Sequence, residues 1–444
     1  MPGESSHDAW VSRDAATVWH GFTQMAAYAD NAPVIVARAE GRELIDVDGR
    51  RYLDAISSLW VTTLGHRVPE LDAALTEQVA KVAHSTLLGN GNVAAIELAE
   101  ALVPRLPVPD AHLLFASDGA AAVEQALKIA FQHWWNRGER GRTRYLALGG
   151  AYHGDTIGSL SVGAGGFGTE LFDPLRFPVV RTAGYEDPHW LPQALAALER
   201  HADELAAVVV EPLVQGAAGM QVADAEDVGR LGRACREAGV LLLADEVATG
   251  FGRTGTLFAS EQCGLEPDLV AIGKGITGGY LPLSATAAAP QVYESFLGAD
   301  LSEATLYHGH SYSGNALACA VARRHLELLD EWDVLTAVRA RADQLGAALD
   351  GPVATHPAVA EVRRRGLMTG VELAPPADDL RWGRRVCAAA VRRGVLLRPL
   401  GDVVVLMPPL TITAGEVDRI VETLLAALDE VAGDHDRPAG AEPT

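Results

Sequence analysis

Short apolar segments alternate with longer helical segments through the middle of the chain. Each of these apolar segments spans four or five residues, and stretches with helical periodicity separate them. Strands that are apolar throughout and separated by helices are typical of a mostly parallel sheet with helices on both faces. The expected strands are 113–116, 145–148, 207–210, 240–244 and 269–272.

The two ends of the chain follow other patterns. Near the N-terminus, segments alternate between apolar and polar positions around Asp48 and Gly49, a pair typical of a tight hairpin turn. We expect residues 1–30 to be irregular, residues 335–432 to form a second region of helices and strands, and the tail after Gly433 to be frayed. The remaining expected elements are strands at 34–39, 44–47 and 51–55, and helices at 69–85, 94–106, 122–137, 225–238 and 314–331.

These patterns predict an α/β protein with two domains. The large domain covers residues 66–330 and contains the mostly parallel sheet with its helices. A smaller α+β domain is formed by the N-terminal segment 1–65 together with the C-terminal segment 331–444. A chain of 444 residues is long enough to build both.

The composition narrows the class of protein. Hydrophobic residues make up 48% of the chain and charged residues 21%, as in a water-soluble globular protein. With 36 Lys and Arg against 58 Asp and Glu, the formal net charge of −22 argues against binding to nucleic acid or to an anionic membrane surface. The polar first residues do not resemble a signal segment and no apolar run reaches membrane-spanning length, so we expect a cytoplasmic protein.

Cysteine and histidine give no indication of a metal site. The cysteines are far apart in the sequence and form no Cys-x-x-Cys pair, so we expect buried free thiols. The histidines lack the spacing of a His-Glu-x-x-His motif, and we predict no bound metal. The four cysteines are Cys235, Cys263, Cys319 and Cys387.

The chain contains only three lysines, which limits any chemistry that needs a lysine amine. Lys81 and Lys128 each follow a glutamate by four residues within a helical pattern. This order favours ion pairs on a solvated helix surface, Glu77 with Lys81 and Glu124 with Lys128.

Lys274 has a different setting. It follows the apolar strand 269–272 and lies between Gly273 and Gly275, which allow close approach of backbone or ligand. A lysine at the carboxyl edge of a sheet is partly desolvated, which lowers its pKa and leaves the amine free to form an imine. The alternatives are a loop lysine at a turn and a ligand for a phosphate.

An acidic residue ends the most apolar of the expected strands. Asp245 follows residues 240–244, and in a parallel sheet ligands bind outside the carboxyl ends of the strands. Pyridoxal phosphate (PLP) needs a carboxylate that keeps its ring nitrogen protonated. Val247 points to the same side of the strand and could pack under the ring. The alternative for Asp245 is a strand terminus that caps a helix.

Other strand ends carry residues that suit the same cofactor. Gly119 and Ala120 open a helix, where backbone N–H groups bind phosphate. Tyr152 follows another strand and could stack on the ring, although it could equally be an ordinary loop aromatic. Glu211 ends a further strand, where its carboxylate could orient the ring or a substrate.

Two long segments at these positions resemble the signature of the class III aminotransferases, which are PLP-dependent transferases of fold type I. These segments are 244–255 (ADEVATGFGRTG) and 267–275 (PDLVAIGKG). Shorter segments resemble those members of the family that convert 7-keto-8-aminopelargonate to 7,8-diaminopelargonate in biotin synthesis. They are Trp19-His20, Ser57–Trp60, 151–156, 214–217 and Arg398-Pro399, within a resemblance that runs from Val18 to Leu428.

The resemblance implies a role for each of these residues. Lys274 would hold PLP as a Schiff base and move a proton, Asp245 would pair with the ring nitrogen, and Tyr152 would stack on the ring. It also implies a homodimer with shared active sites, in which Ser311 reaches the phosphate bound by the neighbouring subunit. The further cofactor-binding residues would be Gly119, Ala120, Glu211 and Val247, and the substrate-binding residues Phe22, Trp60, Tyr152, Gly309 and Arg398, the last as a clamp for the acceptor carboxylate.

Some pocket positions depart from the pattern of the diaminopelargonate enzymes. Phe22 stands where the enteric and mycobacterial enzymes carry a tyrosine, and Leu59-Trp60 replaces their pair of tryptophans. Val405 replaces a tyrosine that helps to hold the substrate. The amino donor would be L-lysine or S-adenosylmethionine. Segments 22–25, 57–60 and 84–89 resemble the Bacillus branch, which uses lysine, and this resemblance favours L-lysine as the donor. The main alternative is a broader ω-amino-acid or diamine aminotransferase. A non-catalytic PLP-binding regulator is disfavoured because the sequence has no helix-turn-helix segment or basic stripe.

Overall fold

The centre of the molecule is a seven-stranded sheet. The computed structural model describes residues 6–164, 168–377 and 381–435. The strand order is β4-β12-β11-β10-β7-β5-β6, and β12 alone runs antiparallel to its neighbours. This arrangement confirms the expected α/β fold with a mostly parallel sheet. The strands are β4 (His112–Ala116), β5 (Arg144–Leu148), β6 (Val180–Thr182), β7 (Leu205–Val210), β10 (Leu241–Asp245), β11 (Leu269–Ile272) and β12 (Ser284–Ala288).

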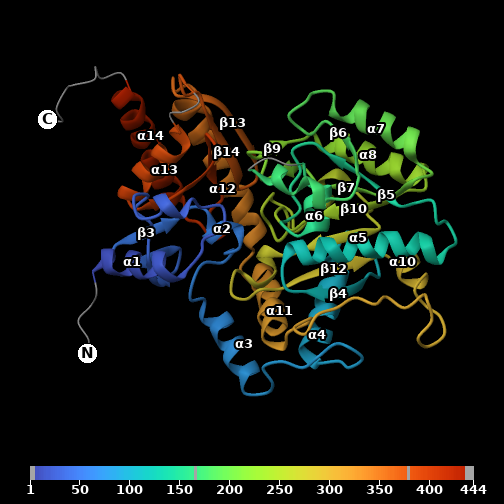
Figure 1. Cartoon of the computed structure of the whole chain (residues 1–444). Helices are drawn as coiled ribbons and strands as arrows, with labels where there is room; N and C mark the ends of the chain where they lie inside the picture. Colours follow the sequence, from blue (N-terminus) through green and yellow to red (C-terminus); the bar gives the residue numbers. More distant parts are fainter. Residues whose placement is uncertain (1–5, 165–167, 378–380, 436–444) are drawn as a thin grey trace.

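Helices cover both faces of this sheet, as the uniformly apolar strands require. Helix α5 (Gly119–Asn136) lies on one face, and α7 (Trp190–His201) and α8 (Ala225–Glu237) lie on the other (Figure 1). Every residue of β7, β10 and β11 is buried between these layers. Full burial on both faces explains why these strands are apolar at each position rather than at every second one.

Three further helices pack beside the sheet. They are α3 (Pro69–Val79), α4 (Val93–Leu102) and α11 (Ala316–Glu331), and α11 contacts both of the others. Helix α3 ends at Val79, six residues before the expected limit at Ser85. The remaining short elements of this part are η2 (Val103–Arg105), α6 (Ile157–Val162), η3 (Thr169–Leu175), β8 (Val214–Gln215), β9 (Gln221–Val222), α9 (Ser260–Cys263), η4 (Lys274–Thr277) and α10 (Pro290–Glu294).

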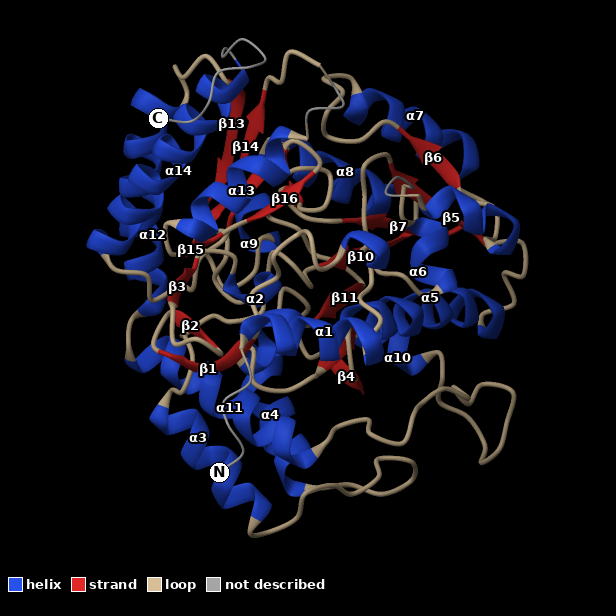
Figure 2. Ribbon diagram, turned by 60° about the vertical axis from the view of Figure 1, so that its left-hand side comes forward, coloured by secondary structure: helices blue, strands red, loops and turns tan. Residues whose placement is uncertain are grey.

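The N-terminal and C-terminal segments lie side by side on one flank of the molecule (Figure 1). The hairpin strands β1 (Val36–Glu40), β2 (Glu43–Asp46) and β3 (Arg51–Asp54) are completed by β15 (Val395–Leu396), which pairs in parallel with β3 (Figure 2). A second four-stranded sheet has the order β13-β14-β17-β16. Its strands are β13 (Val359–Arg365), β14 (Met368–Leu373), β16 (Arg398–Leu400) and β17 (Val403–Leu406), and the nearby helices are α12 (Val334–Ala348), α13 (Trp382–Arg392) and α14 (Ala414–His435).

The structure corrects two expectations for the ends of the chain. Residues 7–17, expected to be irregular, form helix α1 (His7–Thr17), of which only Val11 is buried. Helix α14 continues to His435 and thus past Gly433, while the rest of the tail expected to be frayed lies outside the described residues. No helix in the described part of the chain is long and apolar enough to cross a membrane.

A third correction concerns the surface lysines. The amine of Lys128 lies 3.1 Å from Nδ1 of His308, and the carboxylate of Glu124 accepts hydrogen bonds from the backbone of Gly158 and Ser159. Glu124 therefore satisfies the start of helix α6, and the expected ion pair with Lys128 was wrong. The four cysteines are all buried and free, as expected.

The short helix α2 (Ser57–Trp60) is left-handed. The φ angles of its four residues are 50°, 48°, 74° and 71°, and the N–H of Val61 closes the turn on the carbonyl of Ser57. None of the four is glycine, and a left-handed helical conformation costs about 1–2 kcal/mol for each such residue. The surrounding structure must therefore hold this turn in place.

Candidate active site

Four parallel strands bring their following residues to one edge of the central sheet. Tyr152 and His153 come from the loop after β5, Glu211 follows β7, Asp245 ends β10, and Lys274 follows β11. Hydrogen bonds join the loops across the edge, because the N–H of Tyr152 donates to Glu211 at 3.2 Å and His153 pairs with Asp245. The structure thus brings together the acidic, aromatic and lysine residues that the sequence placed at strand ends.

Asp245 is held on both of its oxygens. Its side chain is buried, Oδ2 lies 2.7 Å from Nδ1 of His153, and Oδ1 accepts a hydrogen bond from the backbone of Val247 at 3.0 Å. Burial disfavours a charged imidazole, but the hydrogen bond and the charge of Asp245, together with Glu211, outweigh it and raise the pKa of His153. The two hydrogen bonds therefore fix the position of the Asp245 carboxylate at the end of β10.

Glu211 and Tyr152 sit in the same buried environment. Burial raises the pKa of Glu211 to about 7, and the nearby charge of His153 lowers it in part. Burial also raises the pKa of the Tyr152 phenol above its ordinary value. Around neutral pH, Tyr152 is thus a neutral aromatic, and burial favours the neutral form of Glu211.

Lys274 begins the 3-10 turn η4 with a φ of 41°. Burial lowers the pKa of its amine, while the charges of Asp245 and Glu211 raise it in part. The Nζ atom lies 5.1 Å from the centre of the Trp60 ring, which is itself buried. An amine with a lowered pKa beside a carboxylate and under an aromatic ring is suited to react as a nucleophile.

The start of helix α5 faces the same loops. Asp118 caps the helix by accepting a hydrogen bond from the N–H of Ala121 at 2.9 Å. A Cβ on Gly119 would lie 2.5 Å from a methyl carbon of Val247, so only glycine fits there without a shift. The first N–H groups of a helix have no carbonyl partner within it and bind anions well.

A cavity of about 350 Å³ opens beside this edge. Its lining is mostly apolar and includes Phe22, Tyr152 and Val403. Small residues supply much of the remaining wall, among them Gly150, Ala151, Ala217, Ala218 and Gly219. The structure therefore places Phe22 and Tyr152 at one cavity, as expected for residues that contact a substrate.

Arg398 and Val405 face each other across a pair of strands. Arg398 begins β16 and is exposed, and its partner in register is Val405 of β17, which is buried. Leu400, two residues after Arg398, lines the cavity. Val405 thus fills the core between the sheets, whereas Arg398 presents its charge to solvent near the cavity.

Gly309 and Ser311 lie in an exposed loop before α11. The carbonyl of Ser311 accepts a hydrogen bond from His84 at 2.6 Å, and the ring of His310 lies 3.4 Å from Oγ of Ser117. This loop therefore contacts the segment that leads into α5 of its own chain. Ser311 itself is exposed in the single chain.

The sequence identified Asp245 and Lys274, but it did not identify His153 as part of the site. His153 was considered only for metal-ligand spacing, which it lacks. Its position directly after Tyr152, behind a buried strand, was the available signal. The pairing with Asp245 depends on the strand order β10-β7-β5, which places the two loops close together.

Replacing His153 by glutamine should change how stability depends on pH. A histidine with a raised pKa binds its proton more tightly in the folded protein, so it stabilises the fold below its ordinary pKa of 6.5 and loses that contribution as the pH rises through the folded pKa. We would measure the free energy of unfolding of the cofactor-free protein in urea. The value for the variant should lie furthest below that of the wild type near pH 6, and the difference should become smaller at higher pH.

His133 provides a control of the opposite sign. Burial lowers its pKa to about 4, so this histidine makes the wild type less stable as the pH falls from 6.5 toward 4. His133→Gln should not show this loss of stability. Equal pH profiles for the His153 variant and the wild type would contradict a protonated His153 in the fold.

Comparison with known proteins finds relatives over nearly the whole chain. A family model described as Aminotransferase class-III matches residues 24–428. An adenosylmethionine-8-amino-7-oxononanoate aminotransferase from Nitratidesulfovibrio vulgaris is 47% identical over 439 residues, which cover 94% of this chain and 81% of that protein. A protein of the same name from Anoxybacillus flavithermus is 38% identical, with 96% of this chain and 98% of that protein covered.

Solved structures agree with these matches. The crystal structure of an adenosylmethionine-8-amino-7-oxononanoate aminotransferase from Methanocaldococcus jannaschii has a TM-score of 0.92 and 37% identity, covering 96% of this chain and 99% of that one. An amine transaminase from an uncultivated Pseudomonas species, solved with PLP bound, has a TM-score of 0.88 and 34% identity, covering 94% and 99%. The expected fold type I is thereby confirmed, and this chain belongs to the class-III aminotransferases, a family of PLP-dependent enzymes.

Proposed function

We propose that the strand ends described above bind PLP and that Lys274 is its covalent attachment point. The residues present suit this cofactor. The buried carboxylate of Asp245 matches a protonated ring nitrogen, and the start of α5 matches a phosphate. Nε2 of His153 is buried without a hydrogen-bond partner among the described residues, which fits a site completed by a further polar group.

Each of the residues at these strand ends would have its own role in the reaction. When bound, PLP supplies an electron sink for negative charge that develops on a substrate carbon. Lys274 would take up and release a proton at Nζ, since burial lowers the pKa of its amine and so favours the neutral form. Asp245, fixed by His153, would hold the proton on the ring nitrogen. Tyr152 and Val247 would cover the two faces of the ring, Gly119 and Ala120 would bind the phosphate, and Glu211 would orient the ring.

The proposed reaction is transfer of an amino group to 8-amino-7-oxononanoate (7-keto-8-aminopelargonate), giving 7,8-diaminopelargonate for biotin synthesis. The names of the relatives in three organisms support this substrate. Arg398, exposed beside the cavity, would bind the carboxylate of the acceptor, and Phe22, Trp60 and Gly309 would contact its chain.

We propose S-adenosylmethionine as the amino donor, in place of the L-lysine that the sequence favoured. The relatives, including the one from Anoxybacillus, are named for adenosylmethionine. Among the described residues that line the cavity, none is Asp or Glu, so no carboxylate there would pair with the distal ammonium of lysine. A sulfonium needs no ion pair and is attracted to an aromatic face such as that of Phe22.

The observation that carries the proposal is that Lys274, Asp245 and Tyr152 lie at one edge of the central sheet, where Tyr152 also lines the apolar cavity. Its test is a donor half-reaction, in which amination of the enzyme-bound cofactor is followed by visible absorbance with S-adenosylmethionine and lysine added separately. Amination by S-adenosylmethionine, reversed by 8-amino-7-oxononanoate, is expected. Amination by lysine alone would overturn the donor and leave the aminotransferase assignment intact.

A broader amine aminotransferase is the second candidate. It is favoured by the similarity to the Pseudomonas amine transaminase at 34% identity and by two aliphatic residues, Leu59 where the enteric and mycobacterial diaminopelargonate enzymes carry tryptophan and Val405 in place of a tyrosine. If simple diamines aminate the cofactor readily and 8-amino-7-oxononanoate does not reverse the change, this second candidate replaces the first.

We further propose a homodimer with shared active sites, located in the cytoplasm, with residues 66–330 as the large domain. Class III enzymes are generally dimeric, and the exposed position of Ser311 would let its hydroxyl reach a phosphate bound by the partner subunit. No nucleic acid or membrane partner is proposed, since the net charge is −22.

Mixing two inactive variants tests the shared site. Lys274→Ala lacks the amine, and Ser311→Asp would place a negative charge against the partner's phosphate. Each heterodimer should contain one site with both defects and one with none, so activity should rise above that of either parent as subunits exchange. Unchanged activity after exchange is demonstrated by mass spectrometry would contradict the shared site.

A further inference from the structure

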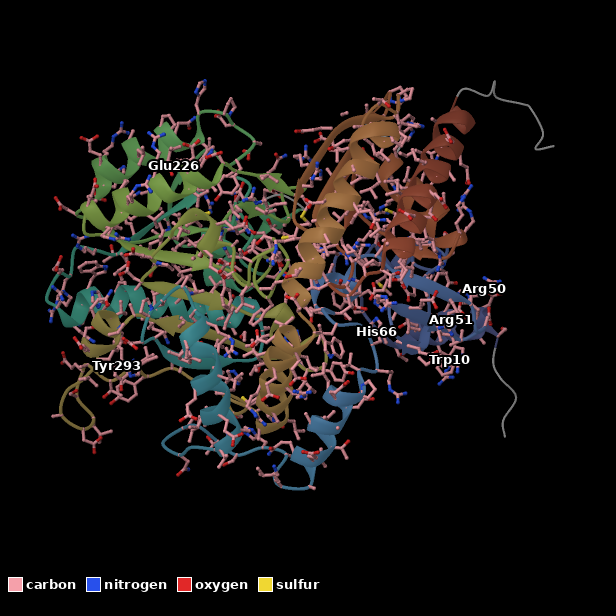
Figure 3. All side chains as sticks on the ribbon, turned by 180° about the vertical axis from the view of Figure 1, so that it is seen from behind. Trp10, Arg50, Arg51, His66, Glu226 and Tyr293 are labelled. Carbon is pink, nitrogen blue, oxygen red and sulfur yellow. The ribbon has the colours of Figure 1, made fainter. Side chains whose placement is uncertain are left out.

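The left-handed turn α2 is fixed by buried polar groups on its flanks. Asp54 is fully buried at the end of β3, and its two carboxylate oxygens accept hydrogen bonds from the N–H of Ser58 at 2.9 Å and from Oγ of Ser58 at 2.7 Å. The same carboxylate lies 3.0 Å from Nε2 of His66, which is labelled in Figure 3. Asp54 thus holds the second residue of the turn by both its backbone and its side chain.

Two other contacts close the turn from the far side. Oγ of Ser57 donates to the carbonyl of Met407 at 2.7 Å. The guanidinium of Arg253, 1% exposed, donates to the carbonyls of Trp60 and Thr62 at 3.3 and 3.1 Å and to Pro408 at 2.7 Å. Every one of these groups is buried, so the conformation of α2 is enforced from three directions.

The turn ends in the residue that covers the lysine amine. Trp60 is 7% exposed, and Nζ of Lys274 lies 5.1 Å from the centre of its ring. The ring is also close to Gly216, where an added Cβ would be 3.3 Å away. The hand of a turn sets the direction in which its side chains leave the backbone, so a right-handed turn would carry the Trp60 indole away from Lys274.

The residues that follow α2 pack directly on the segment that carries Lys274. A Cβ on Gly279 would lie within 3.0 Å of the backbone of Thr62, and a Cβ on Gly275 would lie 3.1 Å from Cγ2 of Thr63. Closely packed atoms therefore connect α2 to the segment that carries Lys274. This packing resists movement of one relative to the other.

We propose that Asp54 is a positioning residue for this enzyme: it locks α2 in its left-handed form and thereby keeps the indole of Trp60 over the amine of Lys274. Asp54 touches neither Lys274 nor the cavity lining, and it acts through Ser58 and the turn. The role of the lock is to shield the bond between Lys274 and the cofactor from water and small reagents. The inference rests on the proposed function in one respect, the assignment of Lys274 as the attachment point of PLP.

The test measures access to that bond in the PLP-loaded protein. Sodium cyanoborohydride is a small hydride donor that reduces the lysine–cofactor bond and removes its visible absorbance. We expect this absorbance to be lost at least about fivefold faster in Asp54→Ala than in the wild type, because release of the turn lets Trp60 move away. Asp54→Asn keeps the side-chain volume and one acceptor oxygen, and it should react at an intermediate rate.

Asp46 provides a matched control. It is also buried, also ends a strand of the same sheet, and accepts hydrogen bonds from the N–H groups of Asp48 and Arg50 and from the hydroxyl of Tyr52. Asp46→Ala should lower the melting temperature as Asp54→Ala does, but it should leave the rate of reduction at the wild-type value.

A second substitution tests whether a faster reduction comes from release of the turn or from a general loss of packing. Ser58 has a φ of 48°, which glycine adopts without a Cβ penalty. In the Asp54→Ala background its hydroxyl has already lost its acceptor, so Ser58→Gly should return the rate of reduction toward the wild-type value. A structural role alone would give no such recovery.

Three outcomes would overturn the inference. The first is a wild-type rate of reduction in folded Asp54→Ala or, if that variant does not fold, in Asp54→Asn. The others are an equal acceleration in Asp46→Ala and no recovery of the rate with Ser58→Gly. The proposed function is tested separately by peptide mapping of the reduced wild type. The cofactor should be found on Lys274, and its attachment to Lys81 or Lys128 would refute the proposed function whatever the rates.

Discussion

Replacing Lys274 by alanine is expected to lower turnover by about 10³-fold or more and to abolish the visible absorbance of lysine-bound cofactor. The reason is that both covalent attachment and proton transfer at Nζ would be lost together, and a positioned acid–base group alone contributes about 10²–10⁴-fold. Lys274→Arg is the sharper variant, because it keeps a positive charge near Asp245 and Glu211 but cannot attach the cofactor. Both are measured by single-turnover amination and by absorbance.

The two remaining lysines are the controls for this experiment. Lys128 lies on α5 and contacts His308, and Lys81 follows helix α3. Lys81→Ala and Lys128→Ala should keep wild-type absorbance and turnover. An active Lys274→Ala protein would remove the chemical basis of the proposed site.

Replacing Asp245 by asparagine should reduce turnover by about 10²-fold while the protein remains folded. A neutral amide no longer favours the protonated ring nitrogen, so the cofactor would withdraw electrons poorly from the substrate carbon. The amide fills the same volume between His153 and Val247. A loss smaller than about tenfold, equivalent to ~1.4 kcal/mol of barrier, would mean that Asp245 is not the partner of the ring nitrogen.

Asp268 is the matched control for Asp245. It precedes β11 and accepts a hydrogen bond from the N–H of Leu242 at 2.9 Å, so it lies at the opposite end of the same pair of strands. Burial raises the pKa of its carboxyl, and the hydrogen bond from Leu242 lowers it in part. Asp268→Asn should change stability without reducing turnover.

Apolar patterning was sufficient to predict the strands that form the centre of the sheet. Strands β10 and β11 are buried at every residue, so their sequences carry the full signal. Strand β12 was missed because Ser284–Ala288 contains small residues with little β preference. It forms a strand because β4 and β11 pair with it on both sides, which is a property of the whole sheet.

The same distinction applies to the site. Asp245 and Lys274 were predictable because each directly follows an apolar strand. His153 was not, since its pairing with Asp245 is made between strands that are separated by β7. The turn α2 was not predictable either, because a left-handed conformation is normally indicated by glycine or asparagine, and Ser57–Trp60 contains neither.

The pairing of β15 with β3 has a consequence for synthesis on the ribosome. Leu53 pairs with Val395, so roughly 340 residues must be added after β3 before its partner exists. At about 5–20 residues per second, β3 waits roughly 20–70 s with one edge unpaired. The central sheet and its helices are made during this interval, and unpaired strand edges attract other chains. Nascent chains of this enzyme should therefore depend on a chaperone that covers the N-terminal hairpin until β15 emerges.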